Sequence, residues 1–310
     1  MKKLILLLIV VCIAAVLLVY LLIPAGLNIS SSAVIYIPST RAYSFIADEN
    51  KWAGWWPKPV AEEQKPGAYN NYTYSITKKI PNVVEISAMN KDEITTGRIS
   101  VLSMPGLSTG VEWTCSFNAG YNPVSRVQQY LQARAIKNNM DTLISRLKVF
   151  LEKQKNVYGM VIEHLKVKDT VLISVKNVYT NYPTPAEINT MIEKLRGYIK
   201  EQGAKEMNYP MLHVQKKDSS HYEAMMAIST NRLLPEKGDL LVKRMAPGNI
   251  LFAEVKGGIN TIREGFAQLE NYKADYGISS PAIPFESLVT DRMKEPDTSK
   301  WVTHLYYPIF

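Results

Sequence analysis

The segment from Pro284 to Phe310 reads PFESLVTDRMKEPDTSKWVTHLYYPIF and contains two alternating apolar runs that flank a polar turn. Alternation of apolar and polar residues is typical of half-buried strands, so the segment predicts a closing β-hairpin. The first run carries a carboxylate, Glu286, where such a strand normally holds a hydrophobic or a solvated polar residue. This acid is the first candidate for a functional group in the chain.

The region before the hairpin predicts an internal repeat. In each half, an alternating run leads to an amphipathic helix, and two further alternating runs follow. Pro185 begins the first helix and Gly203 ends it, while Gly277 ends the second. Two β-α-β-β units packed side by side give a sheet with helices on one face and a groove at their pseudo-twofold junction. The expected strands are 171–179, 211–215, 222–228, 239–245, 250–255, 283–290 and 302–309, and the expected helices are 185–203 and 259–276.

Three stretches of this region resemble the GyrI-like domain, an effector-binding domain that is also attached to AraC-type and MerR-type regulators. Residues 223–228 are similar to the middle strand of that family, residues 254–258 to its glycine turn, and residues 301–309 to its closing strand. The resemblance extends over residues 159–310. It implies a small-molecule pocket whose ligand-binding residues are Glu286, Tyr306, Trp301 and Tyr222.

Two positions depart from the pattern of the GyrI-like family. Leu288 stands where an aromatic residue often follows the strand acid, and His304 replaces the acid often found before the final strand. These changes leave the polarity of the ligand open.

Glu286 has several alternative roles. An ionised carboxylate buried without a partner is costly, so the acid must keep water or a donor, hold a proton, or face a cationic ligand. For a cationic ligand, the rings of Trp301, Tyr306 and Tyr222 would add cation–π attraction. The family also contains hydrolases of strained electrophiles that use an acid and a tyrosine, which implies Glu286 and Tyr306 here. In the last alternative, Glu286 has no functional role and lies on an exposed strand face beside Arg292 or Lys300.

Residues 28–158 predict a separate α+β domain. A strand at 33–37 leads to a short helix capped by Ser39 or Thr40, and a long helix closes the domain. Between them, four alternating runs predict strands at 69–80, 83–90, 94–102 and 110–119.

The tract from Ile37 to Asp48, together with residues 52–57, resembles the START-like helix-grip family, also called SRPBCC or polyketide cyclase-like. That resemblance implies a curved antiparallel sheet around the long helix, with an apolar cavity between them. Trp52, Trp55 and Trp56 then either line a ligand mouth or form a packed aromatic plug.

The N-terminal segment 4–23 contains no charged residue and is long enough to cross a bilayer as a helix. A cleaved signal sequence is the alternative, but its apolar region is usually shorter, and Pro24-Ala25-Gly26 offers no clean cleavage site. Lys2 and Lys3 are expected to stay in the cytoplasm, which places the bulk of the chain in the periplasm or outside the cell. We therefore predict a single-pass membrane protein.

The formal net charge of +8 is concentrated in the long helix between Pro123 and Lys155. Its apolar residues recur at steps of three and four, which indicates an amphipathic helix with a basic outer face. That face is either solvated or rests on anionic lipid. No helix-turn-helix pattern or aromatic-basic platform is present in the sequence, so we predict no nucleic-acid partner.

The cysteines and histidines predict no metal site and no cofactor. Cys115 has no intrachain partner outside the membrane segment, which contains Cys12, so no disulfide framework is expected. The four histidines are scattered, without the spacing of a zinc site.

Together these patterns predict a membrane anchor at 1–27, a helix-grip domain at 28–158 and a GyrI-like domain at 159–310. The leading hypothesis is extracytoplasmic binding of a small apolar or amphipathic cationic ligand in the groove of the second domain, with a START-like cavity as a further place for it. A hydrolase that uses Glu286 and a non-catalytic protein-interaction module are the alternatives.

Overall fold

The computed structural model describes residues 2–57, 67–91, 93–118, 120–167, 170–245, 247–280 and 282–310. The chain divides into two compact units, Met1–Lys153 and Gln154–Phe310. Each unit combines helices with an antiparallel sheet, and an apolar helix precedes the first sheet. The predicted α+β fold class with an N-terminal apolar helix is confirmed.

Helix α1 (Lys2–Leu22) is the apolar N-terminal segment. Residues Lys3–Leu22 have a mean hydropathy of 3.4 and are not buried by the rest of the chain. By length and composition this helix can cross a membrane, and an N-terminal signal sequence has the same properties.

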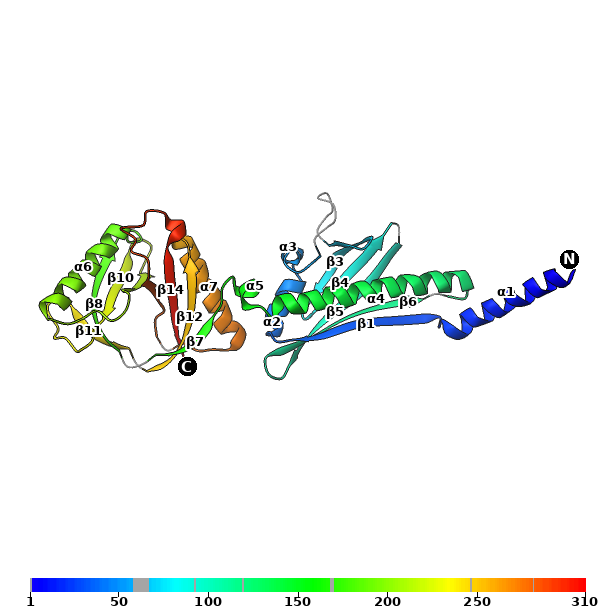
Figure 1. Ribbon diagram of the computed structural model, residues 1–310, viewed down its shortest axis with the longest axis horizontal. Helices are drawn as coiled ribbons and strands as arrows, with labels where there is room; N and C mark the ends of the chain where they lie inside the picture. The colour runs from blue at the N-terminus through cyan, green and yellow to red at the C-terminus, as the bar shows by residue number, and fades with distance from the viewer. Residues whose placement is uncertain are drawn as a thin grey trace. The chain divides into compact units, whose positions relative to one another are not determined.

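The first unit is a six-stranded antiparallel sheet with a long helix against it. The strand order is β1-β6-β5-β4-β3-β2, and α4 packs on β1 and β6 (Figure 1). This is the layout that the helix-grip resemblance predicts. The elements are β1 (Gly26–Ile35), α2 (Ser39–Ile46), α3 (Glu49–Trp52), β2 (Ala68–Tyr69), β3 (Tyr72–Ile80), β4 (Val83–Asn90), β5 (Glu93–Met104), β6 (Ser108–Asn118) and α4 (Pro123–Leu151).

Three features of the first unit differ most from the prediction. Strand β1 starts at Gly26 rather than at residue 33, because it pairs with β6 along its whole length. The predicted strand 69–80 is split after Tyr69 by two residues with positive φ, Asn70 and Asn71. Helix α2 follows Pro38 and has no side-chain cap, so the predicted cap by Ser39 or Thr40 is wrong. The predicted end of the last strand, residue 119, lies outside the described residues.

Three indoles fill the space between the short helices and the sheet of the first unit. Trp52, Trp55 and Trp56 are all buried, and the rings of Trp52 and Trp56 stack with centroids 4.6 Å apart. Nε1 of Trp52 donates to the carbonyl oxygen of Ile46, and the ring of Trp56 meets that of Tyr74 edge to face. The geometry supports the packed aromatic plug rather than the ligand mouth.

The second unit is an eight-stranded sheet of antiparallel pairs in the order β11-β8-β10-β9-β13-β14-β12-β7. Helix α6 packs on β8 and β10, and helix α7 packs on β12 and β14 (Figure 1). The elements are α5 (Gln154–Tyr158), β7 (Glu163–Val167), β8 (Thr170–Tyr179), α6 (Pro185–Glu201), β9 (Met211–Lys216), β10 (Tyr222–Ser229), β11 (Leu241–Met245), β12 (Gly248–Lys256), α7 (Ile259–Tyr276), β13 (Phe285–Leu288), η1 (Thr298–Lys300) and β14 (Val302–Ile309).

The sheet of the second unit has the predicted duplicated β-α-β-β order. One half contains β8, α6, β9 and β10, the other β12, α7, β13 and β14, and the two halves meet where β9 pairs with β13. Each half is preceded by a strand that adds to the other half: β7 pairs with β12, and β11 pairs with β8. This exchange, and the strand β7 itself, were not predicted. Because the helices pack on the outer strands of each half, the β9–β13 pair lies beneath the space between α6 and α7.

Local sequence signals position both helices of the second unit. Thr184 and Glu187 form a capping box at the start of α6, which Pro185 also favours. Gly277 ends α7 in the left-handed conformation, as predicted. The N-terminal ends of these helices border the site described next.

Candidate functional site

A groove of about 440 Å³ lies between the N-terminal ends of α6 and α7, and we call it the α6–α7 groove. Its apolar and aromatic walls come from the loop before α6, from both helices and from the segment before β14. The lining residues are Tyr182, Pro183, Pro185, Ile188, Gly258, Ile259, Asn260, Thr261, Arg263, Arg292, Thr298 and Trp301. The charged side chains among these described residues are two arginines.

Glu286 is buried beneath this groove. It lies on β13, on the same face as Leu288, which packs in the core against α6. Nη2 of Arg292 lies 2.7 Å from Oε2 of Glu286, and both side chains are 5% exposed. Lys300 instead pairs with Asp297. The alternative in which Glu286 is an exposed strand acid with no functional role is therefore wrong, because Glu286 is buried and Arg292 neutralises it.

Three further side chains contact the buried pair. Nη2 of Arg292 also donates to Oγ1 of Thr303 at 3.2 Å, and the guanidinium lies 4.8 Å from the ring centre of Trp301. The hydroxyl of Tyr182 makes a long hydrogen bond of 3.4 Å to Oε1 of Glu286. Arg292 thus connects the acid below with the aromatic wall of the groove above.

Tyr182 is the aromatic residue at the centre of the site. Its ring meets that of Tyr222 edge to face at 6.0 Å, and the guanidinium of Arg263 lies 5.1 Å from its ring centre. Burial, and then the nearby carboxylate of Glu286, raise the pKa of Tyr182 well above its usual value. The hydroxyl therefore stays protonated at neutral pH and acts as a hydrogen-bond donor.

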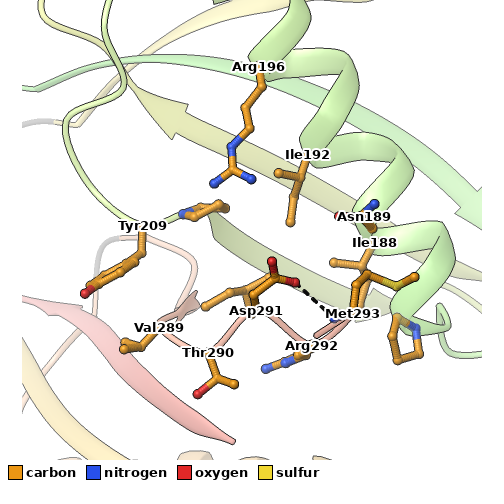
Figure 2. A pocket seen from close by; sticks show the side chains of 13 residues that line it. Ile188, Asn189, Ile192, Arg196, Tyr209, Val289, Thr290, Asp291, Arg292 and Met293 are labelled. Atoms are coloured by element: carbon orange, nitrogen blue, oxygen red, sulfur yellow. Dashed lines mark hydrogen bonds between the residues drawn. The ribbon is translucent and has the colours of Figure 1, made fainter. Parts of the chain in front are cut away.

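A second, smaller hollow adjoins the groove. It has a volume of about 180 Å³ and shares Pro185, Ile188 and Arg292 with the groove. Figure 2 shows the segment Val289–Met293 facing side chains of α6, with Oδ1 of Asp291 accepting a hydrogen bond from the backbone N–H of Met293 at 3.0 Å. Arg292, in the segment after β13, therefore lines both hollows.

Tyr306 lies on the opposite face of the sheet from Glu286. Leu305 and Tyr307, its neighbours on β14, both face α7: Leu305 lies against Gly265, and the hydroxyl of Tyr307 donates to Glu270. Tyr306 therefore points away from the helices, and its ring stacks on Phe285 with centroids 5.1 Å apart. The predicted set of site residues is divided by the sheet: Glu286, Trp301 and Tyr222 lie on the helix side, and Tyr306 does not join them.

Two residues of the site were missed by the sequence reasoning. Tyr182 and Arg263 come from the loop before α6 and from the first turns of α7. A sequence signal was available for Tyr182, because it directly precedes the Pro183-Thr184-Pro185 helix start of the first repeat. In the part of the chain that the structure describes, no group of three or more His, Cys, Asp or Glu side chains could hold a metal ion.

No family model and no curated protein matches the chain. Among solved structures, it is similar to the EcmrR C-terminal domain, with 13% identity, a TM-score of 0.42, and coverage of 49% of this chain and 98% of that one. A hydrolase from Listeria innocua has 10% identity and a TM-score of 0.39, with 48% and 91% of the two chains covered. SAV2435 bound to tetraphenylphosphonium has 13% identity and a TM-score of 0.32, with 49% and 94% covered. The function proposed below follows from this chain's own residues.

Proposed function

We propose that the chain is a membrane-anchored protein that binds a small aromatic molecule in the α6–α7 groove. The observation that carries this proposal is the buried pair of Glu286 and Arg292 beneath a groove walled by Tyr182 and Trp301. A volume of about 440 Å³ is within the range of small-molecule sites, which are mostly apolar with a few placed polar groups.

The charges of the groove favour a neutral or anionic ligand. The sequence suggested a cationic ligand because Glu286 needed a positively charged partner. In the structure, Arg292 is that partner. Because Arg292 and Glu286 neutralise each other, the positive charge left at the wall is that of the exposed residue Arg263. A cationic ligand reaches Glu286 only by displacing Arg292, whereas a carboxylate or sulfonate can pair with Arg263 directly.

Contacts at the end of α1 support an uncleaved anchor. Nη1 of Arg126 donates to the carbonyl oxygen of Ile23 at 2.9 Å, and its guanidinium lies 4.5 Å from the ring centre of Tyr20. The hydroxyl of Tyr20 also donates to the carbonyl oxygen of Tyr121. Cleavage would remove these partners from Arg126, which is only 7% exposed. In this proposal α1 stays in the membrane, its N-terminus is cytoplasmic, and both units are extracytoplasmic.

The other two functions have less support. Hydrolysis would require Glu286 and Tyr306 to act together, but the two side chains lie on opposite faces of the sheet. Tyr182 is the hydroxyl near the acid, and its raised pKa makes it a donor rather than a base. A protein-interaction role has no specific observation in its favour.

Fluorine NMR of the full chain in lipid nanodiscs tests the position of the ligand. The chain has five tryptophans, of which Trp301 lies in the groove and Trp52, Trp55, Trp56 and Trp113 lie in the first unit. With 5-fluorotryptophan incorporated and the Trp301 signal assigned by Trp301→Phe, we expect 2-naphthoate to shift that signal and to leave the other four in place. Tyr182→Ala should weaken binding at least about tenfold, and Tyr306→Ala should leave it unchanged. No saturable shift of Trp301 with any aromatic probe would contradict the proposal.

A further inference from the structure

A larger cavity of about 650 Å³ lies on the face of the second sheet that is not covered by helices. Met225 and Ala227 of β10 line it, while the alternate residues Ala224 and Met226 pack in the core against α6. The cavity is therefore separated from the α6–α7 groove by the thickness of the sheet. We propose that it is a second binding site, for a long-chain carboxylate, and this inference does not depend on the function proposed for the groove.

The floor of the cavity suits a flexible alkyl chain. Its apolar lining includes Leu172, Met211, Met225, Met245, Ile283 and Phe285. Methionine side chains are unbranched and polarisable, so they adapt to apolar ligands of irregular shape. A volume of about 650 Å³ is within the range of small-molecule sites.

The charged side chains at the cavity, among the residues that the structure describes, are of one sign. Lys176, Lys243 and Arg244 line it, and no aspartate or glutamate is among the described lining residues. Lys176 is paired with Glu223 at 3.0 Å, but Lys243 forms no ion pair with any residue that the structure describes. An apolar floor with Lys243 at its edge complements an amphipathic anion rather than a neutral or cationic chain.

A buried polar atom in the wall also lacks a partner. Nδ1 of His213 lies 2.7 Å from the carbonyl oxygen of Pro284, and since a carbonyl only accepts, this nitrogen carries a hydrogen. Nε2 of His213 is buried and has no hydrogen-bond partner among the described residues. If Nε2 carries a lone pair, a protonated carboxyl group can donate a hydrogen bond to it. If Nε2 carries a hydrogen, a carboxylate can accept a hydrogen bond from it. His213 is therefore a candidate contact for the head group.

Methionine-methyl NMR of the full chain in lipid nanodiscs tests this site with dodecanoate as the probe. With ¹³C-methyl methionine, we expect saturable shifts of Met211, Met225 and Met245, while Met191 in the α6 core stays in place. The Trp301 fluorine signal should not move, which separates this site from the groove. Dodecanol and dodecyltrimethylammonium, which have the same chain length, should bind at least about tenfold more weakly.

Three substitutions complete the test. Met225→Trp fills the cavity and should abolish the shifts of Met211 and Met245, whereas Lys243→Glu should weaken dodecanoate at least about fivefold. Lys200→Glu, on the exposed surface of α6, makes the same charge change away from the cavity and should have no effect. Equal binding of all three probes, or no saturable shift of the three methionines, would overturn the proposal.

Discussion

Arg292 and Glu286 form an ion pair in which both side chains are 5% exposed and the nearest nitrogen and oxygen are 2.7 Å apart. Loss of one partner leaves the other charge buried and uncompensated, which costs about 3–5 kcal/mol in known cases. We expect Glu286→Gln and Arg292→Gln each to lower the melting temperature of the second unit, measured by calorimetry. The double substitution should recover most of the loss, because no unpaired charge then remains.

The exposed pair of Lys194 and Asp239 is the control for this prediction. Its two side chains are 47% and 55% exposed, so solvent screens their attraction. Asp239→Asn should leave the melting temperature unchanged. If the double substitution at the buried pair were as damaging as the sum of the single ones, the pair would not be coupled as described.

Two glycines within helices of the second unit should respond oppositely to alanine. A Cβ on Gly265 of α7 would lie 2.5 Å from Cδ1 of Leu305, whereas a Cβ on Gly197 of α6 would meet no atom within 4 Å. Gly197→Ala should stabilise the unit by about 0.5–1 kcal/mol, since alanine favours the helix. Gly265→Ala should destabilise it, because the buried side chain of Leu305 or α7 itself must shift to make room. Chemical unfolding of both variants checks this, and equal effects would exclude close packing at Gly265.

The junction between α1 and α4 depends on Arg126. Its guanidinium donates to the carbonyl oxygens of Ile23 and Gly120, at 2.9 and 3.1 Å. Arg126→Met removes these charged hydrogen bonds, so we expect amide hydrogen exchange in the last turn of α1 to become about tenfold faster. Arg134→Met, at an exposed position of the same helix, should leave exchange there unchanged. Equal exchange in the two variants would mean that Arg126 does not hold the junction.

Cys115 gives a pH dependence with a defined sign. Burial raises the pKa of its thiol to about 11, above the value of about 8.5 for an unfolded cysteine. The unfolded chain therefore loses this proton first, so the contribution to stability is complete below about pH 8.5 and declines as the pH rises towards 11. The difference in melting temperature between the wild type and Cys115→Ala should narrow over this range. A constant difference would show that the thiol is not buried in the folded state.

The repeat and the hairpin could be predicted because they depend on local periodicity. Glu286 was placed correctly on a strand, since it lies in the first of the two runs of the closing hairpin. Its burial and its pairing with Arg292 could not be predicted, because Arg292 lies in the irregular segment between β13 and η1 and its direction depends on tertiary packing.

The composition of the site was harder to predict than its location. Tyr306 was assigned to the site from the resemblance to the GyrI-like family, but the strand register places it opposite Phe285 and on the other face from Glu286. A shift of one residue along a strand reverses the face of a side chain, so a resemblance that finds the right strand does not establish which way a side chain points. Tyr182 is distant in sequence and is brought to Glu286 only when the two halves of the sheet meet at β9 and β13.

The charge preference of the α6–α7 groove tests the central claim most directly. The measurement is the ratio of the affinities of 2-naphthoate and 2-naphthylmethylammonium for the full chain in nanodiscs, compared between the wild type and Arg292→Gln. With Arg292 pairing Glu286, the wild type should prefer the carboxylate. Arg292→Gln leaves the acid uncompensated, so the ratio should shift towards the ammonium by about tenfold or more. A wild type that prefers the ammonium, or a ratio that the substitution does not change, would contradict the account.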